Sequence, residues 1–329
     1  MLDDQVFIQQ NVDLDSAVTI EQIASPEGRI TDQHRRILQV AKAKGTRLPR
    51  EIIKPQLFTE LQIWNHPLHF LDFEAGSFAV PVRSGRNPYD MVVFQFSCHS
   101  LYADGSLEHH QWLHPGDATY PNFELVKELK KVPNLSRGTI VHYSGFERSA
   151  LKRLRSEIKD NPKDLANAGE LVQWLDGIIE HPKVKSGPSP MMADLSRIVK
   201  FYYYNREMAD SLSIKDVVES IMKISPKLKE QYSRPYNSSN FSDFIWWQQK
   251  NGQLISPYQL LQEHPEGSIR EGAEAMVAYA QLRAGNLGPD QAELTRQGLL
   301  RYCELDTLAM VMIYRHWKAV MEENPQNDR

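Results

Sequence analysis

Two acidic residues lie two positions apart in the segment that runs from His69 to Glu74. Side chains alternate between the two faces of a strand, so Asp72 and Glu74 share one face while Leu71 and Phe73 point to the other. Neighbouring carboxylates repel each other, and their pairing becomes favourable when a cation lies between them. The spacing therefore indicates a divalent-metal site. The alternative is a half-buried strand with a solvated acidic face.

A phenol and a carboxylate share one face of an expected helix near the end of the sequence. Tyr302 and Asp306 are at positions i and i+4, in a segment whose leucines supply an apolar packing surface. A tyrosine hydroxyl can orient an attacking water and an aspartate can bind a metal, so the two side chains could serve one hydrolytic site. An ordinary pair of surface residues is the alternative.

A third acid, Glu147, follows a short apolar strand and a Ser-Gly turn, in the first turn of an expected helix. The helix dipole favours an acid at this position whatever its function, so Glu147 fits a metal ligand and a simple helix cap equally well. These acids lie in separate segments, so only a fold that brings several elements together can join them.

The chain is predicted to form a mixed α/β fold. Apolar and β-branched runs separated by turn residues predict an antiparallel meander over residues 69–73, 91–102 and 107–113, and a further strand over 139–143 leads into a helix over 146–158. The second half is expected to be mostly helical, including residues 243–250 and 290–317. This order favours a mixed sheet flanked by helices. We expect an N-terminal extension over residues 1–60, a main domain over 61–320 and a disordered tail over 321–329.

Bulk properties are those of an ordinary globular protein, with 41% hydrophobic and 24% charged residues among 329. Neither a membrane-spanning run nor a signal peptide is recognisable, so we expect a cytoplasmic protein that does not contact membranes. The net charge of −4 argues against a protein that coats nucleic acid by charge alone. The two cysteines, Cys98 and Cys303, lack metal-site spacing, so any metal is expected to be bound by oxygen.

Taken together, the acids occur in the order seen in the DEDD exonuclease superfamily, whose tyrosine variant the chain resembles over about residues 63–318. Two further segments, beginning at Asp194 and at Ser211, look like parts of proofreading-type exonucleases. The segments that start at Phe70, Phe94 and Tyr302 also resemble a bacterial family of unknown function that is predicted to share this fold.

The resemblance implies a ribonuclease-H-like fold and hydrolysis of phosphodiesters from the 3′ end of single-stranded DNA or RNA with two Mg²⁺ or Mn²⁺ ions about 4 Å apart. It also implies roles for the candidate catalytic residues. Asp72 would bridge both ions, Glu74 and Asp306 would complete one site, Glu147 would act through the second ion, and Tyr302 would orient the attacking water.

One position departs from the superfamily pattern, which usually has aspartate where this chain has Glu147. The extra methylene moves the carboxylate by about a bond length, and Mg²⁺ tolerates little displacement of its ligands. Asp194 could then supply the fourth acid. The alternatives are a catalytically weak or inactive nucleic-acid-binding or adaptor module, and a hydrolase of small phosphodiesters.

Candidates for substrate binding are spread over several segments. Lys215, at an expected helix start, could meet a phosphate. Gln95 and His99 alternate along a strand and His142 precedes the Glu147 turn, so each is a candidate, although a structural role is the alternative. The aromatic run from Tyr232 to Trp247 could stack unpaired bases or belong to the core. A protein partner that delivers the substrate is also possible.

Overall fold

The computed structural model describes residues 19–25, 28–179, 192–208, 211–263 and 269–323. Residues 1–18 of the expected N-terminal extension and residues 324–329 of the expected tail lie outside this part of the chain.

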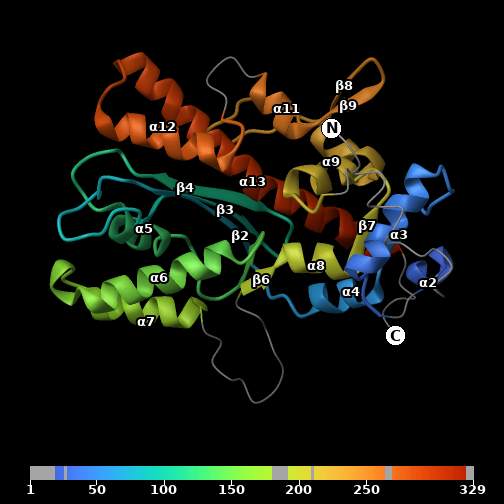
Figure 1. Ribbon diagram of the computed structural model, residues 1–329, viewed down its shortest axis with the longest axis horizontal. Helices are drawn as coiled ribbons and strands as arrows, with labels where there is room; N and C mark the ends of the chain where they lie inside the picture. The colour runs from blue at the N-terminus through green and yellow to red at the C-terminus, as the bar shows by residue number, and fades with distance from the viewer. Residues whose placement is uncertain (1–18, 26–27, 180–191, 209–210, 264–268, 324–329) are drawn as a thin grey trace, which may run out of the picture.

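A five-stranded mixed sheet forms the centre of the molecule (Figure 1). Its strand order is β4-β3-β2-β5-β6. The first three strands pair antiparallel, whereas β2, β5 and β6 pair parallel, so the predicted mixed α/β fold is confirmed. The short strand β6 is an addition to the strands that the sequence predicts. The bounds are β2 (Leu68–Ser77), β3 (Met91–Leu101), β4 (Leu107–Leu113), β5 (Thr139–His142) and β6 (Met192–Asp194).

One face of the sheet is covered by three helices that follow the meander. Leu71 and Phe73 point into this core, in agreement with the alternation expected from the sequence. The 3-10 turn Pro162–Asp164 links two of these helices. The helices are α5 (Pro121–Leu129), α6 (Phe146–Asp160) and α7 (Ala168–Ile179).

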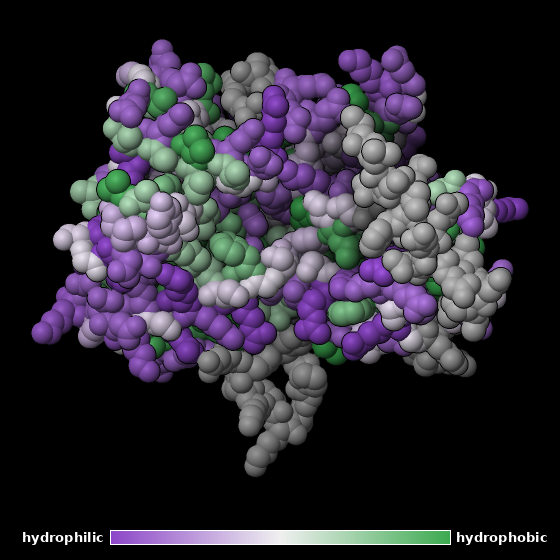
Figure 2. All heavy atoms as spheres, viewed as in Figure 1, coloured by the Kyte–Doolittle hydropathy of each residue, from purple (hydrophilic) through white to green (hydrophobic). Residues whose placement is uncertain are grey.

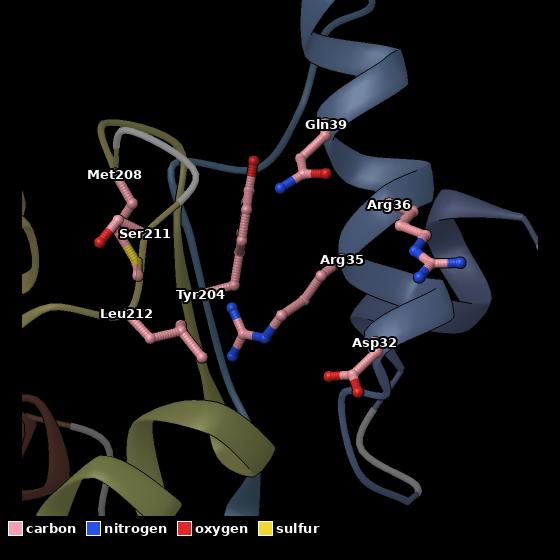
Figure 3. Close-up of a pocket in the computed structure, with 8 residues that line it drawn as sticks. All are labelled: Asp32, Arg35, Arg36, Gln39, Tyr204, Met208, Ser211 and Leu212. Atoms are coloured by element: carbon pink, nitrogen blue, oxygen red, sulfur yellow. The ribbon is translucent and has the colours of Figure 1, made fainter. Parts of the chain in front are cut away.

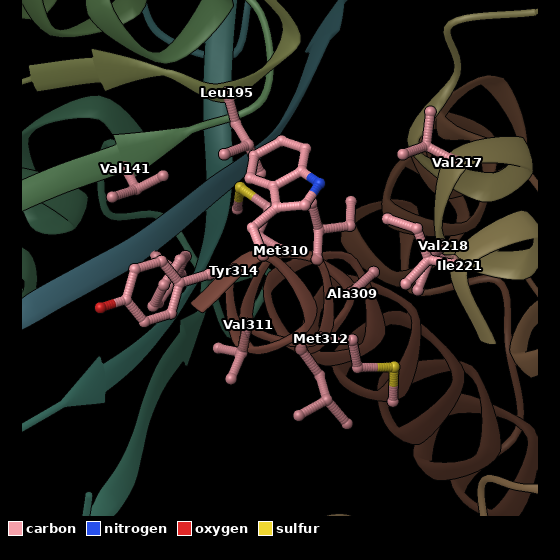
Figure 4. Packing of buried hydrophobic residues seen from close by; sticks show 14 of the residues in the cluster. Val141, Leu195, Val217, Val218, Ile221, Ala309, Met310, Val311, Met312 and Tyr314 are labelled. Carbon is pink, nitrogen blue, oxygen red and sulfur yellow. The ribbon is translucent and has the colours of Figure 1, made fainter. Parts of the chain in front are cut away.

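The long helix α13 (Pro289–Glu323) packs on the opposite face of the sheet. Its second half is apolar almost all round because it is buried between the sheet and α9 (Ile214–Ile224), as Figure 4 shows for the side chains around Met310. A helix in this position holds its residues rigidly against β2 and β3. The same half of the molecule contains α8 (Leu195–Tyr202), α10 (Pro226–Tyr232), α11 (Pro257–Gln262) and α12 (Gly272–Ala284).

The described part of the N-terminal segment packs against the main body through its own small core. Strand β1 (Glu51–Ile53) pairs antiparallel with β7 (Tyr203–Asn205), and Tyr204 belongs to the apolar cluster of the segment. The guanidinium of Arg35 donates hydrogen bonds to the main-chain oxygens of Val199, Lys200 and Tyr203. The helices of the segment are α2 (Ile20–Ala24) and α3 (Asp32–Ala43), whereas α4 (Pro55–Gln62), which spans the expected boundary at residue 60, buries Leu57 and Phe58 in the main core.

The prediction of a helix over residues 243–250 is wrong. Residue Asp243 has a φ of 51°, which ends any helix, and β8 (Gln248–Lys250) pairs with β9 (Gln253–Ile255) in a hairpin. Phe241 and Trp246 are buried in the main core, so tertiary packing of aromatic rings overrides the helical pattern.

The surface seen in Figure 2 is largely hydrophilic along its margins, with less polar residues towards the middle. Among the described helices, none combines the length and the apolar character needed to cross a membrane.

Candidate metal centre

Asp72 and Glu74 lie on the face of β2 that is turned towards α13. Their strand neighbours Leu71 and Phe73 pack on the other side of the sheet. The Glu74 side chain is only 6% exposed, and the register between β2 and β3 shifts directly after it, between Glu74 and Ala75. Such bulges redirect side chains and are common beside functional sites. The predicted pairing of the two acids on one face is confirmed.

Helix α13 brings three side chains from about one helical turn, those of Tyr302, Cys303 and Asp306, to these acids. The Cys303 thiol donates to Oδ2 of Asp72 at 3.3 Å, which fixes the helix against β2. The ligand atoms of Asp72, Glu74 and Cys303 lie within 4.8 Å of one another. Tyr302, 5% exposed, and Asp306 flank this cysteine on the same helix. Tyr302 and Asp306 are one helical turn apart, as expected, and both belong to this centre.

Two residues from other elements complete this side of the centre. The hydroxyl of Tyr258, in α11, donates a 2.5 Å hydrogen bond to Oδ1 of Asp306. The Lys215 ammonium lies 5.1 Å from the ring centroid of Tyr258 and 5.4 Å from that of Tyr302, and it donates to the main-chain oxygen of Arg270. Lys215 is therefore a cation at the edge of an acidic centre.

Glu147 occupies the first turn of α6 and is 2% exposed. Its Oε2 atom is buried without a hydrogen bond, although Nδ1 of His142 lies 3.5 Å away. That nitrogen contacts the main-chain oxygen of Ser144 instead, and Ser144 has a φ of 102° in the turn between β5 and α6. A buried carboxylate oxygen without a donor is costly, and the turn that positions it is strained.

Asp194 has a structural role. Its Oδ1 accepts hydrogen bonds from the backbone of Ser196, Arg197 and Ser144 and from the hydroxyl of Ser196. It therefore caps α8 and ties it to the turn that carries Glu147. These contacts favour Glu147, rather than Asp194, as the fourth acid of the centre.

The acids share an unfavourable electrostatic environment. Burial is the main cause that raises the pKa of Glu74 to about 8, with repulsion from Asp306 and Glu147 adding to it and the charge of Lys215 opposing it. Burial also raises the pKa of Asp306 to about 6. For Asp72, burial followed by repulsion from Asp306, Glu74 and Glu147 raises the pKa well above its ordinary value. Burial raises the pKa of Glu147 too.

This donor set fits a divalent cation bound by oxygen. Glu74 and Glu147 are buried and Asp72 and Asp306 are partly buried, the ionised forms of these four acids repel one another, and Glu147 has an oxygen atom without a partner. A cation would relieve all of these costs together, as it does in carboxylate sites for hard metal ions.

Gln95 and His99, predicted as candidates for substrate binding, are buried in hydrogen-bonded packing. Gln95 donates to the main-chain oxygen of Leu299, and it is fully buried. His99 bonds the hydroxyl of Thr307 through Nδ1 and that of Tyr236 through Nε2. Both side chains therefore fix α13 on β3. His142 lies beside Glu147, where it helps to shape the turn.

The aromatic run from Tyr232 to Trp247 is mainly core. Tyr232, Phe241 and Trp246 are buried in the main cluster, and Tyr236 donates to Oε1 of Glu304. Tyr236, Glu304, His109 and His99 form a polar layer between the sheet and α13, with Ser97 and Thr307 between the two histidines. The packing therefore supports a core role for this aromatic run rather than base stacking.

A surface pocket lies away from the acids, between α3 and β7 (Figure 3). Arg35 projects into it, but its guanidinium is bonded to main-chain oxygens, as described above. The pocket also includes Arg36, Tyr204 and Leu212 and contains none of the candidate site residues.

Sequence reasoning missed two members of the centre. Neither cysteine has the spacing of a zinc site, yet Cys303 contacts Asp72 from 231 positions away. Its place between Tyr302 and Asp306 was the available signal. Tyr258 lies 48 positions before Asp306, and nothing in its local sequence marks it.

The comparisons with known proteins assign a family model to part of the chain. Residues 69–213 match a domain of unknown function (DUF2779). No curated protein and no solved structure matches. The matched segment contains Asp72, Glu74 and Glu147, whereas Tyr302 and Asp306 lie beyond it.

Proposed function

We propose that this protein is a metal-dependent nuclease that hydrolyses phosphodiesters at the 3′ end of single-stranded DNA or RNA. The observation that carries the proposal is that Asp72 and Glu74 from β2, Glu147 from α6 and Asp306 from α13 repel one another electrostatically in a buried to partly buried region that also contains Tyr302. The sheet order, with three antiparallel strands followed by two parallel ones, fits a ribonuclease-H-like fold of the DEDD type.

Asp72, Glu74, Glu147 and Asp306 would hold two Mg²⁺ or Mn²⁺ ions. When bound, such ions activate a water molecule and stabilise the charge that develops on the leaving oxygen. Glu147 replaces the usual aspartate of the superfamily, but from the first turn of α6 its charge still acts on Asp72, Glu74 and Asp306. The longer side chain is thus compatible with a fourth ligand.

The side chains around the acids would have different roles in the reaction. Tyr302 would orient the attacking water with its hydroxyl, which stays protonated because burial and then the charge of Asp306 raise its pKa. Tyr258 holds Asp306 in place. Lys215 would contact a substrate phosphate and offset its negative charge as the strand approaches the acids.

The proposal is tested with 5′-labelled single-stranded DNA and RNA in Mg²⁺ or Mn²⁺. Wild-type protein should shorten one of the strands from its 3′ end, and Asp72→Asn or Asp306→Asn should reduce the rate by at least about a hundredfold. Asp290→Asn, at the exposed start of α13, is the matched control and should retain the rate.

Absence of cleavage with every metal, while the folded protein still binds the strand, would replace the proposal with the nucleic-acid-binding module. Cleavage of a small phosphodiester but of neither strand would point instead to a small-phosphodiester hydrolase.

A further inference from the structure

We propose that Cys303, together with Asp72 and Glu74, forms a site for a thiophilic divalent cation such as Zn²⁺ within the candidate metal centre. This inference rests on the proposed function in that it takes the two acids to be metal ligands, and it adds sulfur as a ligand of the same centre.

The distances match such a site. A Zn²⁺ ion bound about 2.3 Å from sulfur and about 2.1 Å from oxygen holds the two atoms roughly 3.6 Å apart in tetrahedral geometry. Sγ of Cys303 and Oδ2 of Asp72 are 3.3 Å apart. A cation can therefore enter between them after a shift of a few tenths of an ångström.

A third donor is already in reach. Glu74 offers an oxygen within 4.8 Å of both other ligand atoms, and its side chain is 6% exposed. The acid Glu147, whose charge acts on Glu74, has a buried oxygen atom without a hydrogen-bond partner. This unpartnered oxygen favours a cation at this place independently of the thiol.

A sulfur ligand determines which cation this site would bind more tightly. Mg²⁺ is a hard ion that takes oxygen ligands, so it gains nothing from Cys303. Zn²⁺ binds thiolate strongly, and the thiol proton is released to solvent when the sulfur coordinates it. Asp72 then exchanges a weak thiol hydrogen bond for a shared cation. Zn²⁺ would compete with Mg²⁺ for Asp72 and Glu74, so this site would inhibit the proposed hydrolysis.

The other cysteine provides a matched control. Cys98 is buried in the core on the opposite face of the sheet, where its Sγ lies 4.0 Å from Oγ of Ser100. The two cysteines are the only ones in the sequence. A spectroscopic signal from metal-bound sulfur can therefore be assigned by two single substitutions.

The experiment is a titration of the full-length protein with Co²⁺, a coloured substitute for Zn²⁺, that follows the sulfur-to-cobalt charge-transfer band in the near ultraviolet. Wild type and Cys98→Ser should develop the band, and Cys303→Ser and Cys303→Ala should lack it. Asp72→Asn should weaken Co²⁺ binding by at least about tenfold. Circular dichroism checks that each variant is folded.

The inference is overturned if wild type shows no band or if a folded Cys303 variant keeps it. Mg²⁺-dependent degradation of labelled strands is measured on the same samples, which separates the two proposals. Degradation without a cobalt band removes the thiophilic site alone, whereas a cobalt band without degradation in any metal removes the nuclease and leaves the cation site.

Discussion

The hydroxyl of Tyr258 donates a 2.5 Å hydrogen bond to Oδ1 of Asp306, across 48 positions of sequence. This bond ties the short helix α11 to the buried middle of α13, where Tyr302 and Cys303 also face the centre. The orientation of Asp306 thus depends on a segment that carries no acid of its own.

Replacing Tyr258 with phenylalanine should lower the free energy of unfolding by about 1–3 kcal/mol, because Asp306 loses a hydrogen bond in a partly buried place. The same change should raise the pKa of Asp306, since this hydrogen bond favours its ionised form. Urea unfolding measures the first effect. Tyr89→Phe is the control, because the Tyr89 side chain is 68% exposed and should leave stability unchanged.

The stability of the metal-free protein should fall as pH rises. Glu74 has an ordinary pKa of 4.5 and a pKa of about 8 in the folded protein, so its contribution is present below the lower value and is lost as pH rises to the higher one. Asp306, raised to about 6, acts in the same direction. Thermal unfolding in a chelator, from about pH 5 to about pH 9, measures the fall.

Glu74→Gln should flatten this profile, because the amide does not titrate. Added Mg²⁺ should also flatten it in the wild type by favouring the ionised carboxylates. Identical profiles for wild type and Glu74→Gln would show that the acid does not titrate as described.

Exchange of Glu147 for glutamine should have opposite effects with and without metal. In a chelator, the free energy of unfolding should rise by about 1 kcal/mol, because one charge leaves a group of repelling acids. The Mg²⁺ concentration needed to raise the melting temperature should increase by about tenfold, because a ligand is lost. Glu293→Gln, an exposed acid of α13, serves as the control for both measurements. Equal metal dependence in both variants would assign Glu147 to the helix cap alone.

The turn before β5 has no room for a side chain. A Cβ atom on Gly138 would lie 1.8 Å from the main-chain oxygen of Pro67, and β5 pairs with β2 directly after this point. Gly138→Ala should therefore cost about 3 kcal/mol of stability, because backbone atoms must move apart. Gly177→Ala in α7 meets no atom within 4 Å and should instead stabilise by about 0.5–1 kcal/mol. Chemical denaturation of the two variants compares them, and equal stabilities would contradict the packing at Gly138.

Local periodicity was enough to predict much of the frame and part of the site. The alternation along β2 placed Asp72 and Glu74 on one face, and the helical spacing of Tyr302 and Asp306 placed them one turn apart. Both predictions depend only on the geometry of a single element, which the chain carries in its own sequence.

Tertiary structure decided everything that depends on distant partners. Gln95 and His99 had the pattern of pocket residues, yet α13 buries both, and Asp194 became a cap because the turn at Ser144 lies beside it. The helical pattern of residues 243–250 gave way to aromatic packing. Cys303 and Tyr258 entered the centre through contacts across 231 and 48 positions. Sequence by itself determined which faces carry the acids, whereas the packing of α13 on the sheet decided which other groups meet them, because such contacts join residues with no local relation.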